Sequence, residues 1–230
     1  MKIKNKNEKS ESKMEAYSYK TLYQGGSGEI VEKKSRFIAT LAKIESEEEA
    51  FQLIAQIKKK HWDASHNCFA FVLGKGHELQ RCSDDGEPSG TAGRPMLEVL
   101  LREDIHNALV IVTRYFGGTL LGTGGLLRAY QKAALEGFRN STIIEKQSGI
   151  KITIKTDYSA IGKIQYILAQ QEIATIEAQY TDSVVLKVIV AVNRLESFTN
   201  EMAEGTNGTA NLEQGKPVEF GVINNEVIIF

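Results

Sequence analysis

The chain has 230 residues, a hydrophobic fraction of 42% and a formal net charge of −1 at pH 7. This length allows one large or two small domains with a buried core. A charge so close to zero excludes a non-specific nucleic-acid binder with a general basic excess, so any RNA contact must rest on a local patch. Its longest apolar runs, such as residues 108–112, are too short for a bilayer, and the N-terminus lacks the apolar stretch of a secretory signal. We therefore expect a cytoplasmic protein with no membrane partner.

The cysteine pattern argues against a disulfide scaffold and against a metal site. Cys68 and Cys82 are the two cysteines of the chain, and free thiols fit a reducing compartment. His66 precedes Cys68 by two residues, which makes a His/Cys/Cys zinc site conceivable, but no CxxC or HxxxH spacing supports it. We expect neither a bound metal nor a cofactor.

The chain begins with a polar segment rich in Lys, Ser and Asn. Residues 1–16 show no periodicity, which predicts a disordered tail. Three strands are then expected, in residues 21–24, 28–34 and 36–44, separated by glycines. A helix follows, because Ser46 and Glu49 form a capping-box pattern ahead of apolar residues with helical spacing. We interpret the lysines at its end, residues 58–60, as complements of the helix dipole.

Two continuous apolar runs, residues 68–73 and 108–116, have the length of interior strands covered on both faces or nearly so. Together with the preceding elements they predict a first domain in residues 17–140. A linker is expected in residues 141–148 and a second domain in residues 149–230. In the second domain the pattern predicts strand, helix, strand, strand, helix and a terminal strand near residues 227–230. This βαββαβ order is typical of a ferredoxin-like sheet with helices on one face, so the predicted fold class is α+β.

Half of the twenty glycines fall between Gly74 and Gly125, and two loops in this interval carry the functional signal. The first is SDDGEPSGTAGRPMLEVL, where turn-forming residues precede a helix expected to start near Pro95. Its three carboxylates could hold Mg²⁺ or act as acid and base, or they could serve turn architecture and salt bridging with Arg94. The candidates in this loop and beside it are Asp84, Asp85, Glu87, Arg94 and His66.

The second loop lies in RYFGGTLLGTGGLLRAY, residues 114–130, where a buried strand turns through glycines into a helix with Thr123 as the expected N-cap. Free N–H groups at a helix N-terminus and a glycine-rich approach favour phosphate or carboxylate, although the glycines could instead serve only the packing of a tight turn. The spacing fits neither the P-loop nor the dinucleotide-binding fingerprint. Helical side chains lean toward the N-terminus, so the guanidinium of Arg128 should reach back over the loop. The candidate anion-binding residues are Arg114, Tyr115, Gly117, Gly118, Thr123, Gly124, Gly125 and Arg128.

Four blocks of the chain resemble the signature of the Impact/YigZ family: SRFIA from Ser35, the segment Ala64–Phe71, SDDGEPSGTAGRPML from Ser83, and VTRYFGGTLLGTGGLLRAY from Val112. The resemblance covers most of residues 17–140, and the part from Gly149 is similar to the C-terminal domain common in bacterial members. It implies a first domain with the βαβ fold of elongation factor G domain IV, shared with GHMP kinases. It implies a second domain resembling elongation factor G domain V.

Eukaryotic members of this family act as translational regulators, so the resemblance implies contact with RNA, the ribosome or a translation-associated protein, without DNA specificity. We expect such a binding protein, with phosphate held at the glycine loops and no established catalytic activity. The alternative is a nucleotide- or phosphometabolite-binding enzyme that uses the loop of Asp84, Asp85 and Glu87. A third hypothesis is a protein-interaction module, with the acidic second domain binding a basic partner.

Overall fold

The structure, a computed structural model, describes residues 15–230, which form two compact units. The N-terminal unit comprises residues 19–144, and the C-terminal unit comprises residues 145–230 together with the described residues before Tyr19. Among residues 15–230, no helix is both long and apolar enough to cross a membrane.

The N-terminal unit is built on a five-stranded antiparallel sheet. Its strands are β2 (Ser27–Glu32), β3 (Ser35–Lys43), β4 (His66–Leu73), β5 (Leu79–Ser83) and β7 (Ala108–Tyr115). They follow the order β2-β3-β7-β4-β5, which makes β7 the central strand. Two further strands, β1 (Ser18–Gln24) and the short β6 (Ile105–His106), pair in parallel. The two apolar runs of the sequence thus form interior strands, as predicted.

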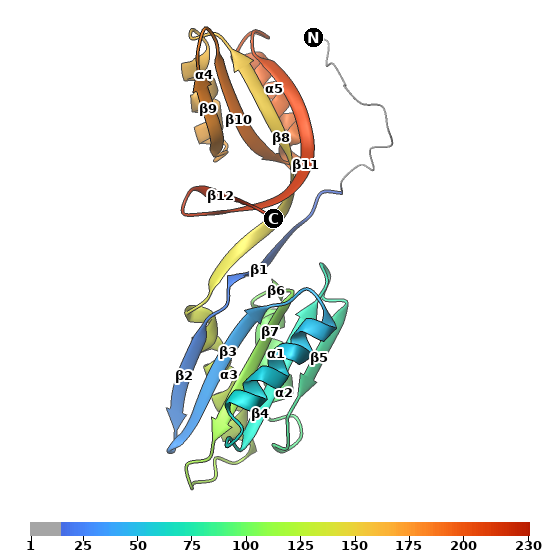
Figure 1. The fold of residues 1–230 in the computed structure, drawn as a ribbon, viewed down its shortest axis with the longest axis vertical. Helices are drawn as coiled ribbons and strands as arrows, with labels where there is room; N and C mark the ends of the chain where they lie inside the picture. Colours follow the sequence, from blue (N-terminus) through green and yellow to red (C-terminus); the bar gives the residue numbers. More distant parts are fainter. Residues whose placement is uncertain (1–14) are drawn as a thin grey trace. The chain divides into compact units, whose positions relative to one another are not determined.

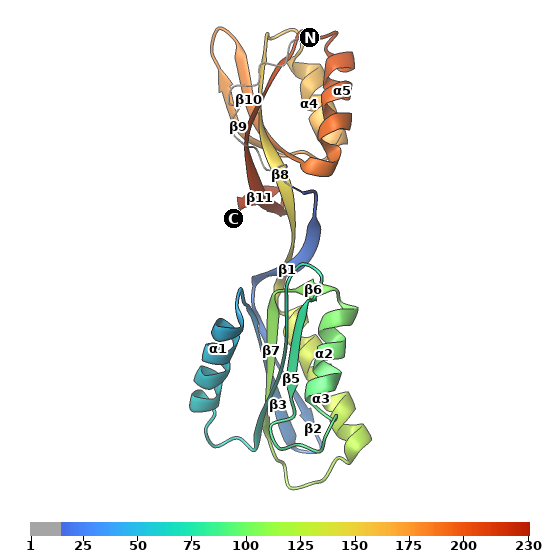
Figure 2. The ribbon, with the colours of Figure 1, turned by 90° about the vertical axis from the view of Figure 1, so that its right-hand side faces the viewer.

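Three helices cover this sheet, α1 (Glu47–Lys60) on one face and α2 (Gly93–Arg102) and α3 (Thr123–Arg139) on the other (Figures 1 and 2). Because side chains alternate along a strand, each interior strand contributes side chains to the hydrophobic cores on both faces of the sheet. Val110 and Val112 of β7 pack under α2 and α3, whereas Leu109 and Ile111 pack under α1. This double coverage explains why β7 is apolar at every position from residue 108 to residue 112.

Helix α1 begins with the predicted capping box, in a slightly different form. The Glu49 N–H donates to Ser46 Oγ at 3.1 Å, as expected. The Glu49 carboxylate accepts instead from the N–H of Glu45, one residue earlier than the usual pattern, at 2.7 Å.

The C-terminal unit contains β8 (Thr142–Thr156), α4 (Ile161–Gln170), β9 (Thr175–Tyr180), β10 (Val184–Ala191), α5 (Leu195–Gly205), β11 (Asn211–Ile223) and β12 (Glu226–Ile229). A short 3₁₀ turn, Val192–Arg194, precedes α5. The strand order β9-β10-β8-β11-β12 is antiparallel throughout, and both helices pack on one face through a core that includes Ile164, Phe198 and Met202. This is the βαββαβ arrangement predicted, except that β11 supplies the sixth element and the terminal strand β12 is an additional hairpin partner.

One segment differs from the sequence-based expectation, and another lies largely outside the described residues. Residues 142–148 of the expected linker, 141–148, form the start of strand β8, and the two units divide between Ile144 and Glu145. The alternating burial of Ile144, Lys146 and Ser148 is that of a strand rather than a linker. Of the expected tail, residues 1–14 lie outside the described residues.

Candidate functional site

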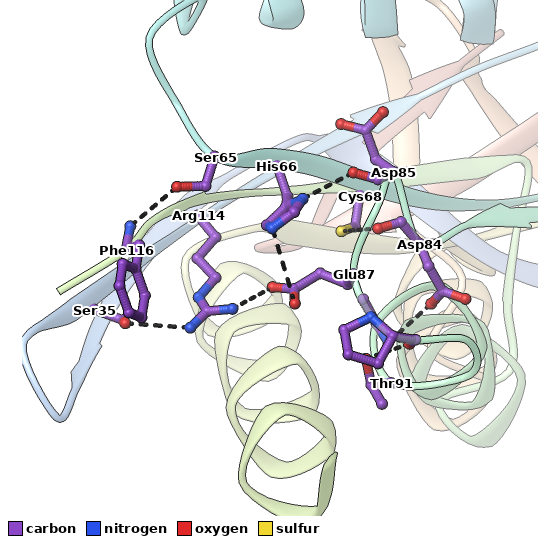
Figure 3. A network of polar contacts seen from close by, with 12 residues as sticks. Ser35, Ser65, His66, Cys68, Asp84, Asp85, Glu87, Thr91, Arg114 and Phe116 are labelled. Atoms are coloured by element: carbon purple, nitrogen blue, oxygen red, sulfur yellow. Dashed lines mark hydrogen bonds and ion pairs between the residues drawn. The ribbon is translucent and has the colours of Figure 1, made fainter. Parts of the chain in front are cut away.

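Arg114 and Glu87 form a buried ion pair at the end of β7, in the N-terminal unit. The Arg114 Nη1 donates to Glu87 Oε1 at 2.6 Å, and the two side chains are 6% and 3% exposed. Tyr130 of α3 donates its hydroxyl to the same oxygen at 2.8 Å. Figure 3 shows the Glu87 carboxylate, from the loop after β5, beside the Arg114 guanidinium. Two donors hold the carboxylate in place, as a buried charge requires.

His66 lies on the other side of Glu87 and presents a lone pair to it. Its Nδ1 lies 2.8 Å from the carbonyl oxygen of Asp85, and because a carbonyl only accepts, Nδ1 carries the hydrogen. In a neutral ring Nε2 is then an acceptor, and it lies 4.0 Å from Glu87 Oε2. The Nε of Arg114 is buried without a hydrogen-bond partner among the described residues. The network therefore leaves two acceptors, His66 Nε2 and Glu87 Oε2, without a hydrogen-bond donor among the described residues.

This network lies at the edge of a cavity of about 510 Å³. His66, Glu87 and Arg114 supply its charged and titratable lining, and the apolar lining includes Phe116 and Leu120, which are 48% and 82% exposed. The Arg114 guanidinium also lies over the Phe116 ring, 5.6 Å from its centroid. An apolar cavity with a few polar groups is the common form of a small-molecule site.

Asp84 and Asp85 are engaged by the backbone around them. Asp84 Oδ1 accepts from the N–H groups of Ala92 and Gly93 at 3.0 and 2.8 Å, and Oδ2 accepts from Gly90 at 2.8 Å. Burial by itself would raise the pKa of Asp84, but these three backbone bonds lower it below its usual value. The side chain thereby satisfies the start of α2, which begins at Gly93, two residues before the predicted Pro95.

Asp85 accepts from the Asn67 N–H at 2.7 Å through Oδ2 and pairs with Lys58 at 2.6 Å through Oδ1. Arg94, expected to pair with these carboxylates, lies on the exposed side of α2 and pairs with Glu98, one turn further along the helix. In this structure Asp84 and Asp85 therefore serve the turn architecture that was one of the two interpretations of the sequence.

The glycine loop between β7 and α3 is held against the β2–β3 turn. A Cβ on Gly117 would lie 2.0 Å from the backbone carbon of Lys34, so only glycine fits. Gly118 and Gly122 have φ of 82° and 72°, which favour glycine as well. Gly122 is the N-cap of α3 and no side chain caps the helix, so the expected N-cap, Thr123, is wrong by one residue. The conformation needed at the cap is left-handed, which excludes a β-branched residue.

Arg128 lies where the direction of helical side chains places it. Its Nη1 is 3.7 Å from the point where a Cβ of Gly124 would stand, over the first turn of α3. It lines a second cavity, of about 250 Å³, with two other cations, Lys33 and Lys132, and one carboxylate, Glu32. We call Lys33, Arg128 and Lys132 the cationic patch. None of the three has an ion-pair partner among residues 15–230.

The structure thus divides the residues that the sequence grouped together. Tyr115 lies on the opposite face of β7 from Arg114, where its hydroxyl donates to Asp63 at 3.2 Å and lies 3.0 Å from His61 Nδ1. Sequence reasoning missed Lys33 and Lys132. The adjacent lysines 33–34, at the end of the strand predicted for residues 28–34, were the available signal.

Comparison with known proteins places the buried network around Glu87 and the cationic patch in one domain. Residues 33–138 match the Impact N-terminal domain, and residues 154–209 match a domain of unknown function, DUF1949. The IMPACT family member YvyE of Bacillus subtilis is 41% identical over 87% of this chain and 92% of its own length. The chain belongs to the Impact family. The family member YigZ of Escherichia coli is 35% identical over 78% of this chain and 89% of its own length.

Two solved structures are similar to this member of the Impact family. A crystal structure of a hypothetical protein has 32% identity and a TM-score of 0.54, with coverage of 86% of this chain and 98% of that chain. The two-domain translational regulator Yih1 is more remote, with 22% identity and a TM-score of 0.35 over 61% of this chain and 54% of that chain. The Impact N-terminal match contains the whole buried network and the cationic patch.

Proposed function

We propose that this Impact family member is a cytoplasmic, translation-associated protein that binds phosphate groups of RNA or the ribosome at the cationic patch and the adjoining glycine loop. The observation that carries the proposal is that Lys33, Arg128 and Lys132 line one cavity with no ion-pair partner among the described residues. Lysine and arginine side chains neutralise the backbone phosphates of nucleic acids, so the phosphates of RNA are suitable ligands for this patch.

The position of the patch favours an anion further. The helix dipole disfavours a cation near the N-terminus of a helix unless a nearby anion compensates its charge. Arg128 is such a cation, because its side chain lies over the first turn of α3. The same turn has no side-chain cap, and glycines lead into it. With a chain charge of −1, such a local patch supplies the attraction that overall charge does not.

Family resemblance supports the choice of RNA over other phosphate compounds. The resemblance implies that eukaryotic members regulate translation and that the two domains have the folds of domains IV and V of elongation factor G. This likeness is part of the proposal, and RNA binding by this chain is its testable content.

The test is co-sedimentation with ribosomes and with free ribosomal RNA across a salt series. The variant Arg128→Ala/Lys132→Ala removes two charges of the patch. We expect weaker binding, and a slope of log affinity against log salt that is shallower by about 0.7 for each single-strand phosphate that the variant no longer neutralises. The charge-matched control is Arg102→Ala/Arg139→Ala, because both arginines are exposed and paired with neighbouring glutamates. Equal weakening in both variants, or no binding at low salt, would overturn the proposal.

A second candidate function rests on the cavity of about 510 Å³. Its size and apolar lining fit a nucleotide or phosphometabolite, and its polar groups are His66, Glu87 and Arg114. Asp84 and Asp85 are held by backbone donors and by Lys58, so this alternative would depend on Glu87. Calorimetric titration with ATP and GTP in the presence of Mg²⁺ tests it. Heat that disappears in Phe116→Ala, with RNA binding unchanged, would favour this function.

A further inference from the structure

Three metal-binding side chains meet at one end of the N-terminal unit, apart from the site described above. His77 lies in the loop between β4 and β5, Asp104 in the turn after α2, and His106 in β6. One ligand atom from each lies within 4.8 Å of the others. His106 is buried, His77 is half-buried and Asp104 is exposed, so the cluster opens to solvent on one side.

The hydrogen bonds of His106 leave a lone pair facing a carboxylate. Its Nδ1 lies 3.1 Å from the carbonyl oxygen of Gly74 and therefore carries the hydrogen. In the neutral ring Nε2 then has the lone pair, and it lies 3.2 Å from Asp104 Oδ1. Two acceptors at hydrogen-bond distance repel each other unless a cation, either a proton or a metal ion, lies between or beside them.

His77 has the same arrangement. Its Nε2 lies 3.0 Å from the carbonyl oxygen of Ile105, which leaves the lone pair of a neutral ring on Nδ1. Histidines that bind metals commonly donate their second ring N–H to a backbone carbonyl, because this bond fixes the tautomer and the ring orientation. Both imidazoles of the cluster have this bond.

We propose that His77, Asp104 and His106 bind a divalent first-row transition metal ion such as Zn²⁺. Two imidazoles and one carboxylate are suitable ligands for zinc and leave its fourth position to water. Ligand atoms at 2.0–2.2 Å from zinc are at most about 4.3 Å apart, so two ligand atoms at the 4.8 Å limit would have to approach by about half an ångström. The ion would join the β4–β5 loop to the turn between α2 and β6.

The side chains that have to move are the two that are not buried, His77 and Asp104. The rings of His77 and His106 are stacked, with centroids 3.8 Å apart and an angle of 13° between their planes. The His77 ring therefore has to tilt for both lone pairs to converge, which lengthens its hydrogen bond to the Ile105 carbonyl. His106 is held by the Gly74 carbonyl and lies against the ring of Tyr19, 5.4 Å between centroids. His106 therefore serves as the fixed ligand, and His77 and Asp104 close on the metal.

Isothermal titration of the full-length, untagged protein with Zn²⁺ tests this inference. We expect one ion per chain and a raised melting temperature, with affinity at least about tenfold weaker in His77→Ala and in Asp104→Asn. Both substitutions change side chains that are not fully buried, which limits their effect on folding. The controls His61→Ala and Cys82→Ser remove side chains of types that can bind zinc but that lie outside the cluster, and they should leave the affinity unchanged.

Two results would overturn the site. One is the absence of heat and of any melting-temperature shift with millimolar Zn²⁺, which would mean that a proton alone occupies the cluster. The other is zinc binding that persists in His77→Ala and in Asp104→Asn but is lost in one of the control variants, which would place the ion elsewhere.

Discussion

Glu87 is the side chain on which the buried network of the N-terminal unit depends. It satisfies Arg114 and Tyr130 together, and no other carboxylate pairs with Arg114 among the described residues. Removal of one partner leaves a buried charge uncompensated, which typically costs about 3–5 kcal/mol. The contribution of this pair is therefore measurable through the free energy of unfolding.

We expect Glu87→Gln to lower the free energy of unfolding by about 3 kcal/mol, because the amide keeps the shape but not the charge that balances Arg114. Urea denaturation followed by circular dichroism measures it. The matched control is Glu98→Gln, which breaks the exposed pair with Arg94 and should change stability by less than about 1 kcal/mol. If the two losses were alike, the buried pair would contribute no more than a surface pair.

Cys68 and Tyr130 make stability depend on alkaline pH. Burial raises the pKa of the Cys68 thiol to about 12, from a usual value of 9.0, and burial also raises the pKa of the Tyr130 hydroxyl. Above pH 9 the unfolded chain releases a proton that the folded chain retains. The unfolded state then binds fewer protons, so stability falls as pH rises, by up to about 1.4 kcal/mol per pH unit for each group.

We expect the urea midpoint to fall from pH 9 to pH 10.5, and to fall less steeply in Cys68→Ala. The control is Cys82→Ala, because Cys82 is exposed and its removal should alter the slope less. Identical slopes in the wild type and in Cys68→Ala would contradict the assignment of this pH dependence to the buried thiol.

At the scale of elements, the β2–β3 turn has an unusual composition. Lys33 and Lys34 have φ of 45° and 68° between the paired residues Glu32 and Ser35, so two lysines occupy a two-residue turn with both φ values positive. Asn-Gly is the usual choice for such a turn, and the β11–β12 turn has two asparagines, Asn224 and Asn225. Left-handed backbone costs about 1–2 kcal/mol at a residue with a long side chain.

We expect Lys33→Asn/Lys34→Gly to raise the free energy of unfolding by about 1–2 kcal/mol and to weaken binding to ribosomal RNA. Stability rises because the turn conformation is relaxed, and binding falls because the patch loses Lys33. Urea denaturation and co-sedimentation measure the two effects. The control Asn225→Gly changes the other turn and should leave RNA binding unaltered. A double variant that binds RNA as the wild type does would separate the turn from the proposed function.

Elements with apolar periodicity or a capping box could be predicted, and the missed ones lack both. The first part of strand β11, Asn211–Ile223, is exposed from residue 213 to residue 217 and contains Gly215 and Pro217, so this part of the sequence has neither alternation nor an apolar run. It is held by backbone pairing with β8, with a register shift between Gln214 and Pro217. Such pairing depends on the neighbouring strand, which a local pattern does not describe.

For the candidate site, both loops could be located from the sequence. The side chains with which the residues of these loops pair could not. Arg114 was expected at an anion-binding surface and lies buried against Glu87. The run around β7 is apolar on both faces, so no alternation indicated which face Arg114 or Tyr115 would take. The partners of Glu87 come from β7 and α3, and those of Asp85 come from α1 and β4. These contacts are long-range, and only the folded chain brings them together.

At the scale of the whole molecule, the described residues form separate hydrophobic cores. The clusters of the N-terminal unit contain residues between Leu22 and Phe138, and those of the C-terminal unit contain residues between Ile150 and Val227. No buried cluster of the described chain includes residues from both units. Because apolar burial is the main source of folding cooperativity, the two units should unfold in separate steps.

We expect differential scanning calorimetry to show two transitions, and matched substitutions to assign them. Leu100→Ala removes a fully buried side chain from the N-terminal core, and Leu186→Ala removes one that is 1% exposed from the C-terminal core. Each should cost about 2–5 kcal/mol and lower its own transition by roughly 10 °C or more, while the other transition stays in place. If either substitution lowered both transitions equally, the chain would unfold as one cooperative unit, and the two cores could not be treated as independent.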